Sequence, residues 1–381
     1  MKRLTTLLLL ATLVAQPLEA QGRIPSKWVM AGVGALVTGL ISFAFLAGNP
    51  NTDIGGCNSK QCVVPVTVGS GLFLGFLIGN EMDHLYNLRY AHAPPLTMNS
   101  TDLPLSLIAN DLTVQRQRVL VAGDGGVEVV HTNRDMEELG IRARGLRGIG
   151  SVTADSSTNT LLVGTGVGLY RFPLTGDEAG TLAHAGEISA ASSDGQHIVV
   201  GLGTAFQIAA LGDSLRFIGD PVEEGSRVVD VQWSRPDLVW VLTEDRLGAY
   251  KVDSAGVATL LGADSLPATG RRLAIEDSTA LIAAGAGGVF AVNIADPSAP
   301  KAIANWSGAR FAYDATLVHG LAYLAAGPEG LYVLTLGPAG FGPRGLDRDA
   351  GFVAAVKTDG QSIYLIDRTG GVLRRMPALL Q

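Results

Sequence analysis

The stretch that decides the fold is Leu281-Ile-Ala-Ala-Gly285 followed by Gly288-Val-Phe-Ala-Val-Asn-Ile294. The same arrangement returns as Tyr323-Leu-Ala-Ala-Gly327 followed by Gly330-Leu-Tyr-Val-Leu-Thr-Leu336. In both copies a short apolar run ends at a glycine break, and a second run begins with glycine. Short apolar runs bounded by glycine are typical of strands that are buried on both faces. Each copy therefore predicts two adjacent strands of one repeated unit.

The second strand of this unit can be followed through seven copies. It begins near Gly126, Gly168, Thr204, Arg246, Gly288, Gly330 and Gly371. Neighbouring starts are 42 residues apart in four intervals, and 36 and 41 residues apart in the other two. A third strand is expected before each pair, joined to it by a hairpin turn at Asp or a similar residue. The expected turn positions are Asp111, Asp155, Asp194, Pro236-Asp237, Asp277, His319-Gly320 and Asp359.

A fourth, outer strand is expected after each of these, for example at Pro300-Lys-Ala-Ile-Ala-Asn305. Four strands per unit and seven units predict an all-β fold, a seven-bladed β-propeller of four-stranded antiparallel blades over residues 103–381. We expect the segment around Leu103–Asn110 to supply the first inner strand and Pro377–Gln381 to supply the last outer strand. Each blade buries its faces against two neighbours, so no blade should be stable alone.

One blade also carries a family resemblance. Gly288–Lys301 resembles the LVIVD-type, YVTN-like propeller repeat, whose units run Gly-Leu-x-Val-x-Asp-Ile-x-Asp-Pro-x-x-Pro. Gly330–Gly337 is similar in its first half, whereas Arg246–Asp253 lacks the leading glycine and Thr204–Leu211 lacks the Asp-Pro loop. The resemblance implies an exported or surface-associated protein with a binding or structural role. It assigns no catalytic residue.

Composition limits the classes of partner. The chain has 381 residues, enough for one large domain and additional segments. It is 47% hydrophobic and contains 49 glycines, which suits many buried strands joined by tight turns. The formal net charge is −7 and no block of Lys or Arg occurs, so we expect no nucleic-acid partner.

The N-terminus has the pattern of an export signal. Met1-Lys-Arg precedes the apolar run Leu4–Ala15, and Ala20 offers a small residue at a plausible cleavage site. Residues 1–20 are therefore predicted to be a signal peptide, cleaved after Ala20 or retained as an anchor. This pattern places the propeller of a bacterial protein in the cell envelope, on the periplasmic or extracellular side.

Residues 21–90 are predicted to form a glycine-rich transmembrane hairpin, with helices at about 28–48 and 63–80. Trp28–Gly48 and Val63–Gly79 contain no charged residue. Glycines on one helix face allow close approach of two helices, either for simple anchoring or for association with another membrane protein. The helix-packing candidates are Gly32, Gly39, Gly71, Gly75 and Gly79. Residues 91–102, with Ala93-Pro-Pro-Leu96, are expected to be a linker.

Cys57 and Cys62 are the only cysteines and lie between the two apolar segments. In an exported chain, two cysteines separated by four residues suggest a local disulfide. A propeller outside the cytoplasm would place this loop inside, where the thiols stay reduced. Both redox states therefore remain open.

A search for catalytic motifs assigns no catalytic, cofactor-binding or metal-binding residue. The six histidines show no HxH or HxxxH spacing, and no Gly-x-Ser-x-Gly elbow occurs. Gly164-Thr-Gly-Val-Gly168 is expected to be a turn between strands, since neither a helix nor a lysine follows it. Four acidic residues are expected at equivalent turns, either as turn residues or as a ring that binds a cation: Asp124, Asp245, Glu329 and Asp367.

The leading hypothesis is a non-catalytic, membrane-anchored module that binds a protein partner or belongs to a membrane complex. Neither a cofactor nor a small-molecule ligand is expected. The alternative is a propeller enzyme, a lactonase-like hydrolase or a quinone-dependent dehydrogenase, that uses the central funnel. Three or more carboxylates within metal-ligand distance at the ring axis would favour the enzyme, whereas an axis lined by Ala, Val and Gly would exclude it.

Overall fold

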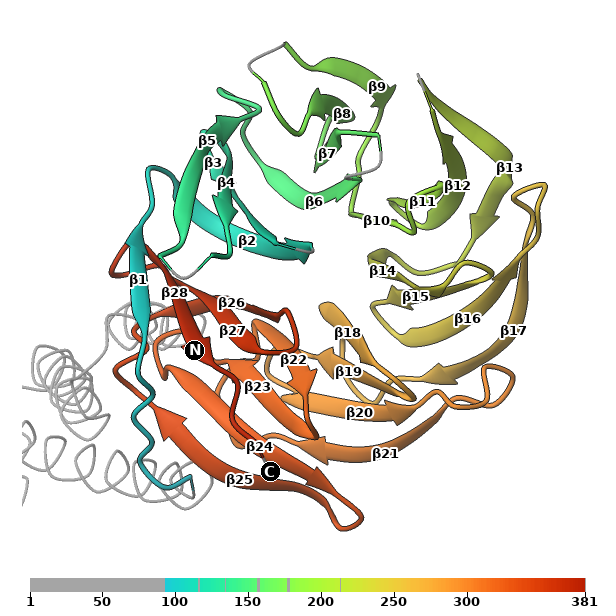
Figure 1. Ribbon diagram of the computed structural model, residues 1–381. Helices are drawn as coiled ribbons and strands as arrows, with labels where there is room; N and C mark the ends of the chain where they lie inside the picture. Colours follow the sequence, from blue (N-terminus) through green and yellow to red (C-terminus); the bar gives the residue numbers. More distant parts are fainter. Residues whose placement is uncertain are drawn as a thin grey trace, which may run out of the picture. The chain divides into compact units, whose positions relative to one another are not determined.

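A computed structural model describes residues 93–115, 117–133, 135–155, 158–176, 179–212 and 214–380. Within these residues, 28 strands form seven four-stranded antiparallel sheets arranged in a ring (Figure 1). The sheets are the blades of a β-propeller, numbered here one to seven from the sheet that contains β2. In the part of the chain that the structure describes, no helix has the length and apolarity needed to cross a bilayer.

Each blade has an inner strand near the ring axis and three further strands toward the outside. The inner strands are β2 (Ile108–Gln115), β6 (Ile149–Asp155), β10 (Ala190–Ser193), β14 (Val228–Arg235), β18 (Arg272–Glu276), β22 (Asp314–Val318) and β26 (Val353–Thr358). The second strands are β3 (Arg118–Asp124), β7 (Thr160–Thr165), β11 (His197–Leu202), β15 (Leu238–Thr243), β19 (Thr279–Ala283), β23 (Leu321–Ala325) and β27 (Ser362–Asp367).

The third and outer strands complete the blades. The third strands are β4 (Gly126–His131), β8 (Gly168–Pro173), β12 (Ala205–Leu211), β16 (Arg246–Val252), β20 (Val289–Asn293), β24 (Leu331–Gly337) and β28 (Val372–Pro377). The outer strands are β5 (Glu137–Arg142), β9 (Thr181–Ala185), β13 (Leu215–Glu223), β17 (Ala258–Ser265), β21 (Lys301–Trp306), β25 (Gly340–Asp347) and β1 (Thr101–Pro104). Every third strand begins at its predicted residue or one residue later, which confirms the seven-fold repeat.

The core consists of seven apolar clusters, one between each pair of neighbouring blades. Between the fifth and sixth blades, for example, Leu281 and Val289 pack against Leu324 and Tyr332. The central strands are buried on both faces because both faces of a blade meet a neighbour; β7 and β15 are buried at every position. The glycine-ended apolar runs of the sequence are these strands.

Two sequence expectations about the ends of the ring are wrong. The outer strand of the seventh blade is β1, from the N-terminal side, which pairs with β28 (Figure 1). The first inner strand begins at Ile108, so Leu103 belongs to the seventh blade. The residues after β28 cannot extend the sheet because they turn away: Ala378 donates to the Gln361 carbonyl, and Leu379 donates to the Tyr323 hydroxyl at 2.7 Å.

A third expectation is wrong for a single residue. Five of the seven predicted hairpin turns lie between an inner strand and the second strand, and Asp155 is the last residue of β6, directly before its turn, but Asp111 lies inside β2. The corresponding turn falls between Gln115 and Arg118. A bulge between Ala109 and Asp111 lengthens this strand and directs Asp111 toward the ring axis.

The segment before β1 follows the outside of the sixth blade. The amide of Leu96 donates to the carbonyl of Leu346 at 3.0 Å, and the amide of Leu346 donates to Pro94 at 2.9 Å. Met98 is buried, and its amide donates to the Asp347 carboxylate at 3.1 Å. Residues 94–98 thus bind the outer strand of the sixth blade, and β1 completes the seventh blade.

We predict that Leu103→Pro lowers the free energy of unfolding by about 2 kcal/mol, because it removes an amide donor from the strand that closes the ring. Leu103 pairs with Leu373 and packs against the cluster between the seventh and first blades. Thr101→Ala, an exposed change on the same strand, should have little effect. Chemical denaturation measures both; equal stability of the two variants would contradict closure by β1.

Candidate functional site

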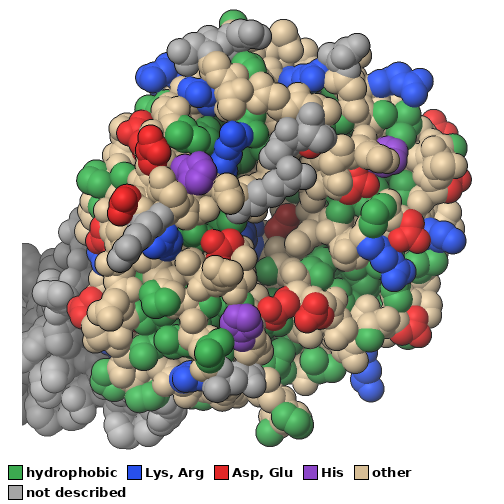
Figure 2. Space-filling view, viewed as in Figure 1, with side chains coloured by type: hydrophobic (Ala, Val, Ile, Leu, Met, Phe, Trp, Pro, Cys, Tyr) green, Lys and Arg blue, Asp and Glu red, His purple; other side chains and the backbone are tan. Residues whose placement is uncertain are grey.

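The ring axis is hollowed from both ends, and Figure 2 shows the hollow of one face with acidic and basic side chains around it. One cavity, of about 510 Å³, lies where the inner strands end and is lined largely by polar side chains, including Thr113, Ser192 and Gln232. The other, of about 460 Å³, lies where the inner strands begin and includes Arg271 and Tyr313. The following residues line both cavities: Asp111, Gly150, Ser189 and Arg272. The two cavities therefore meet at the level of Asp111 and Arg272.

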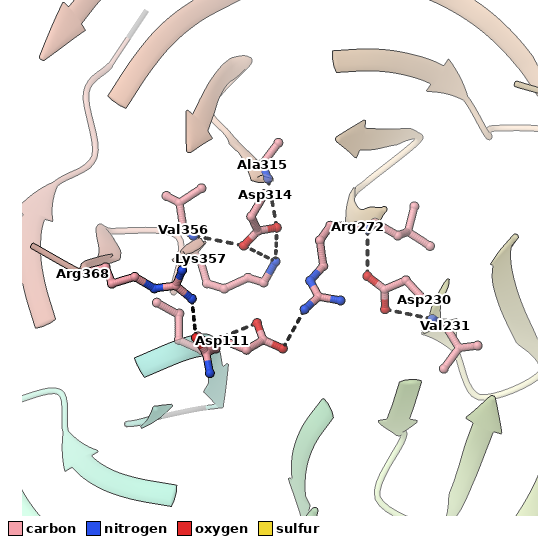
Figure 3. A network of polar contacts seen from close by, with 12 residues as sticks. Asp111, Asp230, Val231, Arg272, Asp314, Ala315, Val356, Lys357 and Arg368 are labelled. Atoms are coloured by element: carbon pink, nitrogen blue, oxygen red, sulfur yellow. Dashed lines mark hydrogen bonds and ion pairs between the residues drawn. The ribbon is translucent and has the colours of Figure 1, made fainter. Parts of the chain in front are cut away.

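An ion pair crosses the ring at this level. Arg272, the first residue of β18 in the fifth blade, donates from Nη2 to Oδ2 of Asp111 in the first blade at 3.3 Å (Figure 3). The other carboxylate oxygen of Asp111 accepts the amide of Leu112 at 2.9 Å. Asp111, and after it Asp230 and Asp314, raise the pKa of the Arg272 guanidinium. The pair links two blades that are not neighbours.

A second ion pair joins the sixth and seventh blades. Asp314, the first residue of β22, is almost completely buried and accepts Nζ of Lys357 on both oxygens, at 2.7 and 2.8 Å. The same carboxylate accepts the amides of Ala315 at 2.9 Å and Val356 at 3.0 Å. It thus ties its own inner strand to the next inner strand of the ring.

Asp230 repeats this arrangement between the fourth and fifth blades. Its oxygens accept the amides of Val231 and Leu273, both at 2.8 Å. Burial raises the pKa of Asp230, although the nearby cations Arg272 and Lys357 and the amide of Leu273 oppose the shift. Asp111, Asp230, Arg272, Asp314 and Lys357 will be called the axial network.

The local sequence explains how the strands present these groups to the axis. Asp230, Arg272 and Asp314 are spaced by 42 residues, the length of the repeat, so they occupy equivalent positions on three consecutive inner strands. Asp111 and Asp230 each follow a bulge in the inner strand. A bulge places two residues opposite one and redirects a side chain.

The axial network holds three carboxylates and two cations: two ion pairs, Arg272–Asp111 and Lys357–Asp314, and Asp230, which is bound by backbone amides. In charged form these groups sum to −1. Asp111 accepts one backbone amide and a cation, Asp230 accepts two amides, and Asp314 accepts two amides and a cation. Among the residues that the structure describes, no three His, Cys, Asp or Glu side chains are placed to hold a metal ion. Within these residues, the axis therefore has neither the metal-binding set of carboxylates that would favour an enzyme nor the lining of Ala, Val and Gly that would exclude one. It is charged, but its carboxylates face cations of the protein itself.

The four acidic residues expected at equivalent turns do not converge. Asp367 accepts the amides of Phe352, Thr369 and Gly370 and pairs with Arg374 at 2.9 Å. Glu329 accepts the Tyr332 hydroxyl at 3.2 Å and pairs with Arg310 at 3.4 Å. Asp245 accepts the Thr243 hydroxyl at 2.7 Å, the main cause of its lowered pKa. Asp124 is exposed. Three of these residues therefore stabilise their own turns or neighbouring segments.

Other positions considered in the sequence have local roles. Gly164–Gly168 spans the turn between β7 and β8, where the Thr165 hydroxyl accepts the amide of Gly168 at 3.1 Å. Nδ1 of His131 accepts the amide of Asn133 at 3.0 Å, and His184 packs edge-on against Phe217. Several predicted residues lie outside the described range: Cys57, Cys62, His84, His92, Gly32, Gly39, Gly71, Gly75 and Gly79.

Sequence reasoning missed the axial network. It assigned Asp111 to a turn and did not single out Asp230, Arg272, Asp314 or Lys357. The 42-residue spacing of Asp230, Arg272 and Asp314 was a usable signal, because equivalent positions of a propeller repeat lie at equivalent distances from the axis. The bulge in β2 was not visible in the sequence.

Comparisons with known proteins support the fold. No protein-family model and no curated protein sequence matches the chain. Solved structures do: the WD40 β-propeller domain of Doa1 matches with a TM-score of 0.56 and 12% identity over 74% of this chain and 96% of that domain. A chain of the mitotic checkpoint complex matches with a TM-score of 0.60 and 14% identity, over 75% of this chain and 96% of that chain. U3-55K matches with a TM-score of 0.60 and 9% identity, over 75% of this chain and 100% of that chain. At these identities the similarity shows the β-propeller fold alone.

We predict that Arg272 and Asp111 are energetically coupled. Arg272→Met should lower the free energy of unfolding by about 3 kcal/mol, because three buried or half-buried carboxylates then face only Lys357. Asp111→Asn in the Arg272→Met background should cost at least about 1 kcal/mol less than in the native protein. The exposed pair Arg235–Asp237 provides a matched control, for which R235M and D237N should show coupling below about 0.5 kcal/mol. Additive effects at Asp111 and Arg272 would contradict the network.

The raised pKa of Asp230 predicts a pH dependence of stability. The folded-state pKa lies above the ordinary value of 3.8, so the folded protein binds this proton more tightly than the unfolded chain. The resulting stabilisation is complete below the ordinary pKa and is lost as pH rises through the folded-state pKa. The native protein should therefore lose stability relative to Asp230→Asn as pH rises from about 4 to 7. A difference between the native protein and Asp230→Asn that stays constant over this pH range would contradict the shift.

Proposed function

We propose that this protein is a non-catalytic β-propeller of the bacterial cell envelope that is anchored in a membrane and binds a protein partner. The observation that carries the proposal is the state of the ring axis. Its carboxylates are held by Arg272, Lys357 and backbone amides instead of being left free to converge on a ligand. A funnel enzyme of the hydrolase or dehydrogenase type needs such convergent groups, so this arrangement does not favour the alternative.

The sequence before the propeller supports the membrane location. The signal-like start of residues 1–20 and the uncharged segments Trp28–Gly48 and Val63–Gly79 fit export and anchoring. The resemblance of Gly288–Lys301 to the LVIVD-type repeat supports the same role, since that repeat implies exported or surface-associated binding proteins. The glycine spacing of the two segments adds a second possible contact surface, a partner helix within the membrane.

The fold supports a protein partner. A propeller presents two broad faces of loops on a rigid ring, and loops on a rigid scaffold commonly carry binding residues. One structurally similar chain belongs to a complex by its name, the mitotic checkpoint complex. A protein-binding module is therefore consistent with this architecture.

A detergent pull-down tests the proposal. The full-length protein and a variant lacking Trp28–Gly79 are captured from their own cells, and bound proteins are identified by mass spectrometry. The matched control replaces Trp28–Gly79 with an unrelated transmembrane hairpin of equal length. We expect a specific partner that all three forms retain, because the binding surface lies on the propeller.

Two other results are informative. A partner bound only by the full-length protein would assign recruitment to the hairpin and keep the anchored module. Absence of any specific partner, or recovery of all forms in the soluble fraction without detergent, would contradict the proposed function. Substrate screening would then be directed at the two axial cavities.

A further inference from the structure

Five side chains form a continuous stack at the end of the ring where the inner strands begin. Arg271 precedes β18, Phe311 and Tyr313 precede β22, Phe352 precedes β26, and Arg368 follows β27. These five residues will be called the arginine–aromatic arc. They come from the fifth, sixth and seventh blades, and Arg271 and Tyr313 line the cavity of about 460 Å³.

The distances show that the stack is unbroken. The Arg271 guanidinium carbon lies 5.1 Å from the Phe311 ring centre, and the Phe311 and Tyr313 ring centres are 4.7 Å apart. The Tyr313 and Phe352 ring centres are 5.6 Å apart, and the Arg368 guanidinium carbon lies 5.6 Å from the Phe352 ring centre. The three rings are half-buried and both arginines are exposed. The rings of the arc are therefore packed into the protein, while its two guanidinium groups are accessible to solvent.

Two glycines fix the rings in place. Gly285 and Gly327 have φ of 56° and 58°, and each exchanges backbone hydrogen bonds with the next blade, at Ala312 and Val353 respectively. A Cβ at Gly327 would lie 2.5 Å from the Tyr313 ring, and a Cβ at Gly285 would lie 3.1 Å from the Phe311 ring. Only glycine combines this backbone with this proximity, so the repeated Ala-Ala-Gly of the sequence seats the aromatic residues.

In the part of the chain that the structure describes, the two arginines of the arc differ from neighbouring arginines in having no carboxylate partner. Arg227 pairs with Glu187, Arg310 with Glu329, and Arg272 with Asp111. Within the described residues, Arg271 and Arg368 have no carboxylate partner: Arg271 stacks on Phe311, while Arg368 stacks on Phe352 and donates to the Ala109 carbonyl and the Asn110 side chain. Two cations at the ends of an aromatic stack therefore retain donors that the protein does not use.

We propose that the arginine–aromatic arc binds an acidic protein segment that also carries an apolar or aromatic anchor, an inference that rests on the proposed function and specifies its surface. A guanidinium that lies over a ring still presents its donors in its own plane, where they match a carboxylate. The half-buried rings offer apolar contact between the two cations, and the adjoining cavity has room for a side chain. Aromatic and arginine residues are also the types enriched where binding energy concentrates in interfaces.

The nearby charges favour a peptide over a nucleic acid. Glu187 and Glu244 line the same cavity, and the chain as a whole carries −7. A continuous phosphate backbone would meet these carboxylates, whereas a peptide can place its acidic residues only opposite Arg271 and Arg368.

Selection from a random library of 12-residue peptides displayed on phage tests the inference. The target is the detergent-solubilised full-length protein, beside R271A/R368A and the control R235A/R344A, which removes two exposed arginines elsewhere. We expect selected peptides to be enriched in Asp or Glu together with Leu, Phe or Trp. Their affinity should fall about tenfold or more for R271A/R368A, remain unchanged for the control, and fall when their acidic residues become Asn or Gln.

The remaining outcomes overturn the inference. These are no enrichment, enrichment without acidic residues, affinity that is insensitive to R271A/R368A, or displacement of the peptide by an equimolar single-stranded oligonucleotide that binds the arc more tightly. Thermal melts of each variant exclude unfolding as the cause. A cellular partner that R271A/R368A still captures would contradict binding at the arc and leave the proposed function intact. Peptide binding at the arc without any cellular partner would support the arc and contradict the proposed function.

Discussion

The packing of apolar blade faces against one another is the constraint on which this structure depends. Strands such as β7 and β15 are buried on every side, so no blade can shield its own surface and the ring must close. The seven apolar clusters between neighbouring blades differ in the number of buried residues that they contain. The cluster between the second and third blades has five fully buried members, fewer than any other, and it lies where the repeat shortens to 36 residues.

Closure of the ring depends on a strand from the N-terminal side of the propeller. The last repeat supplies three strands, and β1 supplies the fourth, so the first and last described segments are parts of one sheet. Residues 94–98 also bind the outside of the sixth blade through Leu346 and Asp347. Force or cleavage on the chain just before β1 would therefore act on the ring itself, because the connecting segment is part of its hydrogen-bonded edge.

The sequence was sufficient for features that recur and insufficient for features that occur once. The 42-residue period located all seven third strands within one residue, because identical packing demands produce identical spacing. The partner of β28 could not be read from the period, since its strand comes from outside the last repeat. The pairing of Arg272 with Asp111 across the ring joins residues 161 apart in the sequence, and the bulge that turns Asp111 inward lies outside the repeat pattern, in the pairing of β2 with β3. The arc was also missed, because its aromatic residues lie in loops and occur in only two blades.

The two sets of charges in the ring are suited to different tasks. At the axis, exchange of the Arg272 or Lys357 partner for a ligand would leave buried carboxylates unpaired, which is costly in a region of low solvation. The axial network therefore favours rigidity over binding. At the rim, Arg271 and Arg368 are exposed and stacked on rings, so binding a carboxylate requires neither the breaking of an internal ion pair nor the movement of a strand. A partner that engages this rim would meet a surface already held in place by Gly285 and Gly327, while the axial network ties the fifth blade to the first and fourth, and the sixth blade to the seventh.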